Sequence, residues 1–342
     1  MKVYVISFTK KGTLLAQKIC QKLERAMCFS MKVVQDDIEM VTSLEKWTQK
    51  AFEEADGIVF VGACGIAVRA IAQYLKNKYQ DPAVVVIDEK GQFAISLLSG
   101  HIGHGNALAK KVAEITNGTP VITTATDVNG IFAVDTWVKE NGFLYLNKQK
   151  AQKAMKEISA TLLEEKAVGF DSMFYYSKLP KGLVATKDCE VGISVSIYKQ
   201  NKIFQQTLAL IAPIVHIGIG CKKNTSFEEI EQCVFSVLEE ENIAIEAIEA
   251  VATIDLKQNE KGLLTFCQSY QKQLNIFSTE ELSAVKGDFT ASDFVLEKTG
   301  VDNVCERAAL CSAQNGKIIV SKRAKNGVTV ALAMKTILLS FS

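Results

Sequence analysis

Short apolar runs alternate with amphipathic segments through the first third of the chain, and this alternation predicts strands and helices in turn. A repeating strand–helix order predicts a mostly parallel sheet that is covered by helices on both faces. The expected strands are Val3–Phe8, Met31–Val34, Gly57–Val61, Ala83–Asp88, Phe93–Leu97 and Val121–Thr124, and the expected helices are Thr13–Glu24, Leu44–Ala55, Ile66–Leu75 and Asn106–Thr116.

A hairpin and a change of pattern interrupt this order. Asp88-Glu-Lys-Gly-Gln92 lies between two strand-like runs, and its glycine and charges predict a hairpin turn. After Asp127 the pattern loosens and a long charged helix, Lys148–Glu165, is expected. The sequence therefore predicts an α/β protein with mostly parallel sheets covered by helices. It divides into an N-terminal domain (1–136), a smaller middle domain (137–212) and a C-terminal α/β domain (214–342).

The composition narrows the class of protein. Hydrophobic residues make up 48% and charged residues 23% of the 342 residues, values typical of soluble globular proteins. A formal charge of +1 gives no reason to expect nucleic acid or a membrane surface as a partner. The nine cysteines are scattered without a Cys-x-x-Cys pair, which argues against a zinc knuckle or a disulfide framework and favours a reducing, cytoplasmic location.

Three polar loops follow apolar runs in the N-terminal domain. They are Gly62–Arg69, Ser99–Asn106 and the segment Thr123–Asp127. Loops that leave the carboxyl ends of parallel strands gather at one edge of an open α/β sheet, where such folds bind their ligands. The sequence therefore predicts that Arg69, His101 and Asp127 face one common cleft.

The Ser99–Asn106 loop carries His101 and His104 among glycines. Such a turn exposes backbone N–H groups and leads into a helix N-terminus, which favours negative charge, and histidine is suited to proton transfer near neutral pH. A strand-to-helix turn with a histidine cap is the plain alternative. Metal binding by the two histidines lacks a third ligand at a telling spacing, so no metal site is assigned.

The two flanking loops also allow more than one interpretation. Cys64, Gly65 and Arg69 could bind a carboxylate or phosphate through backbone donors and a guanidinium fork, or they could form a tight turn with a surface arginine. The loop lacks the Lys-Ser/Thr ending of a P-loop. Thr123–Asp127 could orient a substrate or a catalytic histidine, or it could only turn the chain and cap a helix.

The C-terminal domain has a weaker signal. Gly218-Ile-Gly-Cys221 resembles part of a dinucleotide fingerprint, but the third glycine is missing at the required offset. Glu306 and Arg307 are the polar positions of a segment whose Ala-Ala-Leu face is expected in the core. These residues alone do not define a ligand.

The order of the motifs is more specific than any one of them. Gly65-Ile-Ala-Val-Arg69, Leu98-Ser-Gly-His101-x-Gly103-x-x-Asn106 and Pro120-Val-Ile-Thr-Thr-Ala-Thr-Asp127 follow one another, and the third domain adds Gly218-Ile-Gly-Cys221 and Val304-Cys-Glu306. Together they resemble the cobalt-precorrin-5A hydrolase (CbiG) family of anaerobic cobalamin biosynthesis. Relatives usually have Gly-Ala where this chain has His104-Gly105, so the resemblance supports His101 and not His104 as a catalytic residue.

The resemblance implies hydrolytic opening of the ring A acetate lactone of a cobalt-corrinoid intermediate, with release of acetaldehyde and formation of cobalt-precorrin-5B. Cobalt arrives within the substrate, so no separate cofactor is expected. His101 is expected to act as the general base and to be oriented by Asp127 or Thr124. The expected substrate-binding residues are Cys64, Gly65, Arg69, Ser99, Gly100, Gly103, Asn106, Thr123, Thr126, Gly220 and Glu306.

A different function remains open at this point. The same clefts would suit a non-catalytic corrinoid carrier or a regulatory protein of the pathway. The sequence also leaves open a homodimer and contacts with other enzymes of cobalamin biosynthesis. A phosphate- or nucleotide-binding enzyme is disfavoured because the P-loop lysine and the third dinucleotide glycine are missing.

Overall fold

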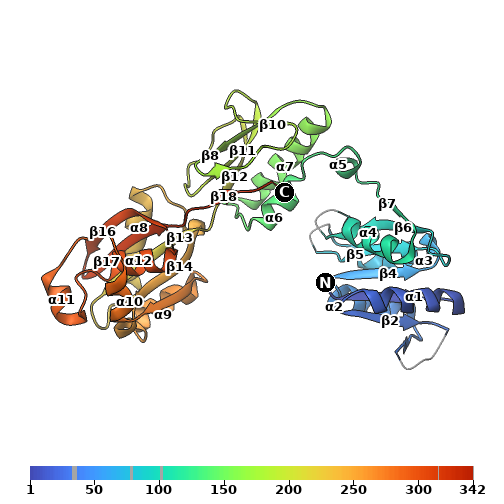
Figure 1. Cartoon of the computed structure of the whole chain (residues 1–342), viewed down its shortest axis with the longest axis horizontal. Helices are drawn as coiled ribbons and strands as arrows, with labels where there is room; N and C mark the ends of the chain where they lie inside the picture. The colour runs from blue at the N-terminus through green and yellow to red at the C-terminus, as the bar shows by residue number, and fades with distance from the viewer. Residues whose placement is uncertain (33–36, 78–79, 101–102, 315, 342) are drawn as a thin grey trace. The chain divides into compact units, whose positions relative to one another are not determined.

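The computed structural model describes residues 1–32, 37–77, 80–100, 103–314 and 316–341. The chain divides into two compact units, residues 1–136 and 137–342 (Figure 1). We describe each unit by itself. The predicted fold class is confirmed, because both units combine helices with mostly parallel sheets.

The first unit has one sheet with the strand order β3-β2-β1-β4-β5-β6-β7. Every neighbouring pair is parallel except β5 and β6, which are antiparallel. The elements are β1 (Val3–Ser7), α1 (Lys10–Lys22), β2 (Ala26–Ser30), β3 (Glu39–Met40), α2 (Leu44–Glu54), β4 (Gly57–Val61), α3 (Cys64–Ile71), the 3-10 turn η1 (Ala72–Tyr74), β5 (Ala83–Ile87), β6 (Phe93–Leu98), α4 (Gly105–Thr116), β7 (Thr119–Val121), α5 (Ala125–Val128) and α6 (Val134–Glu140), which continues into the second unit.

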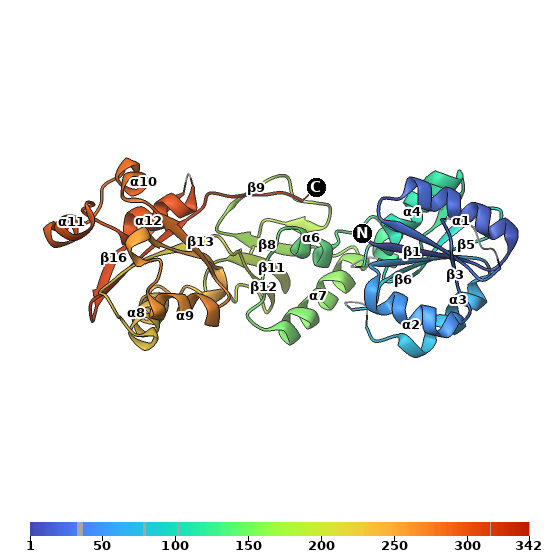
Figure 2. The same ribbon diagram turned by 90° about the horizontal axis from the view of Figure 1, so that it is seen from below.

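Side chains of the central strands point alternately to the two faces of this sheet, so a separate hydrophobic core lies on each face. In β1, Val3 and Val5 face the core beneath α1 and α4, whereas Tyr4 and Ile6 face the core beneath α2 and α3. Figure 2 shows these two helix layers on either side of the sheet. Because both faces are covered, the central strands β1, β4 and β5 are buried along their whole length and consist almost entirely of apolar residues, as expected for parallel strands.

Two predicted strands are misplaced. Pairing with β1 begins at Ala26, so the second strand is Ala26–Ser30 and not Met31–Val34, of which Val33 and Val34 lie outside the described residues. The last strand is Thr119–Val121 and not Val121–Thr124. It is an edge strand that pairs only with β6, a position that tolerates Pro120 without a backbone N–H.

The second unit begins with a smaller α/β part. Its four-stranded parallel sheet has the order β10-β8-β11-β12, and a separate parallel pair joins β18 to β9, so the end of the chain returns to this part. Trp137 stacks on Phe341 there and donates its indole N–H to the carbonyl of Ser340. The elements are α7 (Lys148–Leu163), β8 (Val168–Ser172), β9 (Tyr175–Tyr176), β10 (Leu183–Val184), β11 (Val191–Ser196), β12 (Gln206–Ile211) and β18 (Leu338–Leu339).

The rest of the second unit forms a five-stranded sheet of order β15-β14-β13-β17-β16, in which β13, β14 and β15 are parallel. Figure 2 shows α12 on one side of it and α8 and α9 on the other. The elements are β13 (Val215–Cys221), α8 (Phe227–Glu240), η2 (Ile245–Ala247), β14 (Ile248–Ile254), η3 (Asp255–Lys257), α9 (Lys261–Ser269), β15 (Gln273–Phe277), α10 (Thr279–Ala284), α11 (Asp293–Thr299), α12 (Cys305–Ala313), β16 (Lys317–Lys325) and β17 (Val328–Met334). A capping box formed by Ser226 and Glu229 begins α8.

Candidate functional site

Two of the three predicted loops do meet. Because β6 and β7 are parallel, the loop Ser99–Asn106 and the segment Thr123–Asp127 leave the same edge of the sheet. Asn106 joins them: its side-chain amide donates to Thr124 Oγ1 at 3.2 Å and to Asp127 Oδ2 at 3.0 Å. Only 5% of Asn106 is exposed, whereas Asp127 lies at the surface. The three side chains form a polar cluster that we call the Asn106 cluster.

The backbone of the Ser99–Asn106 loop is tightly folded around this cluster. Ser99 adopts a positive φ of 53°, its hydroxyl donates to the carbonyl of Asp81, and its own carbonyl accepts from the N–H of Gly105. A Cβ on Gly100 would lie 2.7 Å from Asn106 Oδ1, and a Cβ on Gly103 would lie 2.5 Å from the Cβ of Ser99. Both glycines are therefore required by close packing in the loop.

One buried atom of the cluster lacks a partner. Among the described residues, no group donates a hydrogen bond to Asn106 Oδ1, although this atom is shielded from solvent. An unsatisfied buried acceptor costs about 1–3 kcal/mol, so such atoms require an explanation. Asn106 lies in the first turn of α4, and His104, which precedes this helix, is in the left-handed conformation. No described side chain caps α4. Partial positive charge from the helix dipole therefore faces this loop.

The remaining predicted residues of this edge lie around the cluster. Thr123 is exposed and Thr126 is half-buried in α5, where its carbonyl accepts from the N–H of Ile131. His101 lies outside the described residues, so its predicted role as general base stays a prediction.

The prediction that Arg69 shares a cleft with these residues is wrong. β5 and β6 are antiparallel, with Val84 opposite Leu98, so β6 ends at the edge where β5 begins. The loop that carries Cys64, Gly65 and Arg69 follows β4 at the other edge, where Gly62 N–H donates to the carbonyl of Ile87 at the end of β5.

Arg69 has a local partner on that other edge. It is exposed, and its Nη1 donates to the carbonyl of Gly65 at 3.1 Å, one turn earlier in α3. Cys64 and Gly65 form the first turn of this helix, and no side chain caps it. The loop is built as a strand–turn–helix unit, as predicted, but it is separated from the Asn106 cluster by the length of the β-strands.

Glu306, which was expected to contact substrate, lies inside the C-terminal sheet domain. It is 2% exposed, and its carboxylate accepts from Thr290 N–H at 2.7 Å, Thr290 Oγ1 at 3.0 Å, Lys322 N–H at 2.7 Å and the side-chain amide of Asn303. Four donors occupy its two oxygens, so this carboxylate ties α12 to a loop and to β16. The described contacts of the Glu306 carboxylate are hydrogen bonds that hold these elements of the domain together.

Gly220, the other predicted residue of this domain, lies in β13 opposite Thr329 of β17. A Cβ at Gly220 would approach Thr329 Oγ1 to 2.6 Å, so the glycine leaves room for that hydroxyl, which donates to the Gly220 carbonyl. The neighbouring Gly218 is more constrained, since a Cβ there would overlap the carbonyl oxygen of Cys305 in α12.

A second polar cluster was missed by sequence reasoning. His216, on β13, is 2% exposed; its Nδ1 lies 2.7 Å from Ser312 Oγ and its Nε2 lies 3.3 Å from Glu249. Asn275 donates to the same serine hydroxyl, and Lys335 pairs with Glu249 at 2.6 Å. These side chains line a cavity of about 470 Å³. Burial lowers the pKa of His216, so the ring is neutral at pH 7. A lone histidine in an apolar strand carried no signal for this arrangement.

Two further observations concern a metal site and a membrane span. Within the described residues, no group of three or more His, Cys, Asp or Glu side chains is arranged to hold a metal ion. In the same part of the chain, no helix is long and apolar enough to cross a bilayer.

Comparison with known proteins gives consistent matches along the chain. Residues 46–127 match the family model "Cobalamin synthesis G N-terminal", and residues 215–333 match "Cobalamin synthesis G C-terminus"; the two together cover more than half of the chain. A cobalt-precorrin-5A hydrolase from Priestia megaterium is 28% identical over 96% of this chain and 94% of its own length. A protein of the same name from Salmonella typhimurium is 29% identical, with 97% of each chain covered. A solved structure, a putative cobalamin biosynthesis protein G homolog from Sulfolobus solfataricus, covers 97% of this chain and 96% of its own at 24% identity, with a TM-score of 0.42.

Proposed function

The chain belongs to the cobalamin synthesis G family, and from this premise we propose that it is a cobalt-precorrin-5A hydrolase. The observation that carries the proposal is the similarity to curated hydrolases of that name over nearly the whole of both chains. A third relative, named a probable cobalt-precorrin-5A hydrolase, comes from the archaeon Methanocaldococcus jannaschii and is 28% identical over 98% of this chain. The substrate is therefore a cobalt-corrinoid.

The finer proposal concerns the bond that is hydrolysed. Water adds to the carbonyl carbon of the ring A acetate lactone, and the ring C–O bond breaks to give a carboxylate and an alkoxide. The alkoxide then collapses to the carbonyl of acetaldehyde while the adjacent carbon–carbon bond breaks. The electron pair of that bond passes to the electron-poor cobalt macrocycle, which later takes up a proton. Cobalt belongs to the substrate, and the proposal needs no resident metal.

The Asn106 cluster supports a location for this chemistry at the β6–β7 edge. Ester opening needs a base for the attacking water and donors for the tetrahedral oxyanion. His101 belongs to the loop that Asn106 joins to Asp127, and we propose that His101 is the base and Asp127 its orienting carboxylate. Backbone N–H groups of Gly100 and Gly103 would hold the oxyanion, each contributing ~10²–10³ in rate.

Asn106 has a positioning role in this scheme. Its amide holds Thr124 and Asp127 in place from the buried side, so the carboxylate of Asp127 is directed before substrate arrives. Since no donor among the described residues reaches the buried Oδ1, we propose that it accepts a hydrogen bond from a donor that enters with the substrate or with the attacking water. Such preorganisation is how a buried amide contributes to catalysis without touching the reacting carbon.

The test is an assay of acetaldehyde release from the lactone substrate under anaerobic conditions. A general base contributes ~10²–10⁴ in rate, so His101→Ala is expected to lose at least 10²-fold. Asn106→Ala should lose turnover with little change in KM, and Lys111→Ala, an exposed pair with Glu114, serves as the matched surface control. Near-full turnover by His101→Ala would remove this residue from the mechanism.

The carrier hypothesis gives a different result in the same experiment. Mass spectrometry of the reaction would then find the lactone bound but unchanged by the wild-type protein. A ring-opened product formed only with active protein would exclude a purely binding function.

A further inference from the structure

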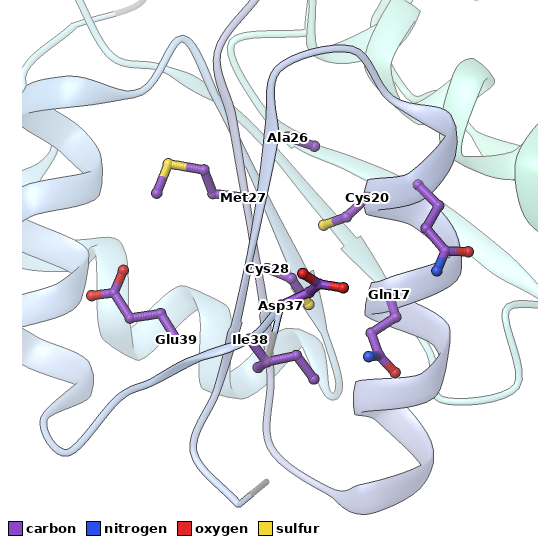
Figure 3. Close-up of a pocket in the computed structure, with 9 residues that line it drawn as sticks. Gln17, Cys20, Ala26, Met27, Cys28, Asp37, Ile38 and Glu39 are labelled. Atoms are coloured by element: carbon purple, nitrogen blue, oxygen red, sulfur yellow. The ribbon is translucent and has the colours of Figure 1, made fainter. Parts of the chain in front are cut away.

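A cavity in the first unit is lined by two cysteines, and none of its described lining residues belongs to the loops that follow β4, β6 or β7. It has a volume of about 550 Å³ and opens between α1, β2 and the chain before β3. Figure 3 shows the sulfur atoms of Cys20 and Cys28 directed into this cavity. Its other lining residues are Gln17, Gln21, Ala26, Met27, Asp37, Ile38 and Glu39.

The local structure explains why the two thiols meet. Gln17, Cys20 and Gln21 are spaced at three and four residues, so they share one face of α1. Cys28 lies in β2, whose Ala26 and Cys28 point to the same face of the sheet because side chains alternate along a strand. Cys28 is packed in the core beneath α1, and Cys20 packs against the same core cluster. The short connection from the end of α1 to the start of β2 brings the side chains of Cys20 and Cys28 together.

Both thiols line the same cavity and pack against the same core cluster. The interaction with Cys20 lowers the pKa of Cys28, and the interaction with Cys28 raises the pKa of Cys20. Cys267 and Cys305 differ, because burial is the main cause that raises the pKa of each to about 11. A thiolate is the reactive form of cysteine, so Cys28 beside Cys20 has a chemical character that the deeply buried cysteines lack.

We propose that Cys20 and Cys28 form a reversible oxidation site, in which a small uncharged peroxide converts the two thiols into a disulfide. The Cys28 thiolate attacks one oxygen of hydrogen peroxide, the O–O bond breaks, and sulfenic acid and hydroxide form. The sulfur of Cys20 then attacks the sulfenic sulfur, the S–S bond forms, and the hydroxyl leaves as water with the proton of Cys20. The two sulfur atoms supply the two electrons that reduce the peroxide.

The lining of the cavity selects the class of oxidant. In the described part of the chain it contains the carboxylates of Asp37 and Glu39 and no lysine or arginine. A negatively charged disulfide such as oxidised glutathione is therefore repelled from the opening, whereas hydrogen peroxide is neutral and small enough to enter. This site does not depend on the proposed hydrolase activity.

The sequence offers a direct measurement. Trypsin cleaves after Lys18, Lys22, Arg25 and Lys32, which places the two cysteines on separate peptides, residues 19–22 and 26–32. The full-length protein is reduced, treated with graded hydrogen peroxide, alkylated and digested. We expect the linked pair of peptides, two hydrogens lighter than the sum of its parts, at least tenfold faster than any other cysteine linkage. Dithiothreitol should reverse the linkage.

Variants and a second oxidant sharpen the result. Cys20→Ser should leave a sulfenic acid on Cys28 that dimedone traps, and Cys189→Ser, a half-exposed cysteine elsewhere, should leave the linkage unchanged. If peroxide oxidises other cysteines while the 19–22 and 26–32 peptides stay unlinked in the wild-type protein, the proposal is wrong. A linkage that forms as fast with oxidised glutathione as with peroxide would overturn the selection by charge.

Discussion

Replacing Glu306 by glutamine tests how the C-terminal domain is held together. The substitution keeps the volume of the side chain, but an amide has one acceptor oxygen where the carboxylate has two. Whichever oxygen becomes NH₂, it faces at least one backbone donor, either the N–H of Lys322 or the N–H of Thr290. Hydrogen bonds to charged groups contribute about 1.5–3 kcal/mol each, and a buried donor left without a partner costs about 1–3 kcal/mol. We expect a local loss of roughly 2–4 kcal/mol.

Hydrogen exchange measured by mass spectrometry reports the stability of individual segments, whereas a global unfolding curve of a multidomain chain averages over several domains. Exchange at the amides of Thr290 and Lys322 follows the free energy of local opening. A loss of about 2–4 kcal/mol corresponds to exchange that is roughly 30- to 700-fold faster in these two segments, since 1.4 kcal/mol is a factor of ten. Peptides from the first unit should not change.

Glu297→Gln is the matched control, because Glu297 lies on α11 with 74% of its side chain exposed. Surface substitutions of this kind stay within about 0.5 kcal/mol. Protection at Thr290 and Lys322 that is the same within about twofold in Glu306→Gln and Glu297→Gln would refute the assigned structural role and return Glu306 to the set of candidate substrate contacts.

Three further predictions follow from the described geometry. Gly218→Ala should destabilise the second unit by about 3 kcal/mol or more, measured as faster hydrogen exchange in β13 and α12, because the new Cβ overlaps the carbonyl of Cys305. Burial lowers the pKa of His216 below 6.5. The stability that comes from its neutral form is therefore fully present above about pH 6.5 and is lost as the pH falls through the folded-state pKa. His216→Gln should flatten the fall in Tm between about pH 7 and about pH 5. Arg69→Ala should reduce acetaldehyde release by less than about threefold, whereas Asp127→Asn should reduce it by at least about tenfold, and equal large losses would show that the substrate reaches both edges of the sheet.

The fold class could be predicted because it follows from the hydrophobic periodicity and from the order of strands and helices along the chain. The central strands β1, β4 and β5 are buried at every position and apolar at every position except Ser7, as coverage on both faces requires. The errors fall toward the two sides of the sheet: β7 is an edge strand, and the outer neighbour of β2 is the two-residue strand β3. Local pattern identifies a buried strand, whereas tertiary pairing decides where an outer strand begins.

The polar clusters were harder to predict. Cys20 and Cys28 carry no spacing motif. The partners of His216 come from α12 and β14, and Asn275 of β15 donates to Ser312, so the cluster joins residues far apart along the chain. Asn106 was predicted as a substrate-binding residue, but its amide is directed at Thr124 and Asp127. These arrangements depend on side chains that long-range packing brings together, which a single sequence does not encode as a local signal.

The location of the candidate site depends on one short turn. The Asp88–Gln92 hairpin and a common edge for all three loops were both predicted, yet they are incompatible. Asp88 accepts hydrogen bonds from the N–H groups of Lys90, Gln92 and Phe93, so the turn is closed and β6 reverses direction against β5. A reversal exchanges the two edges for every strand after it, and β7 follows β6 in parallel. The carboxyl-edge rule therefore applies separately to each set of parallel strands and indicates two edges. The contacts of Asn106 with Thr124 and Asp127 are the reason why we propose the chemistry at the edge that holds them.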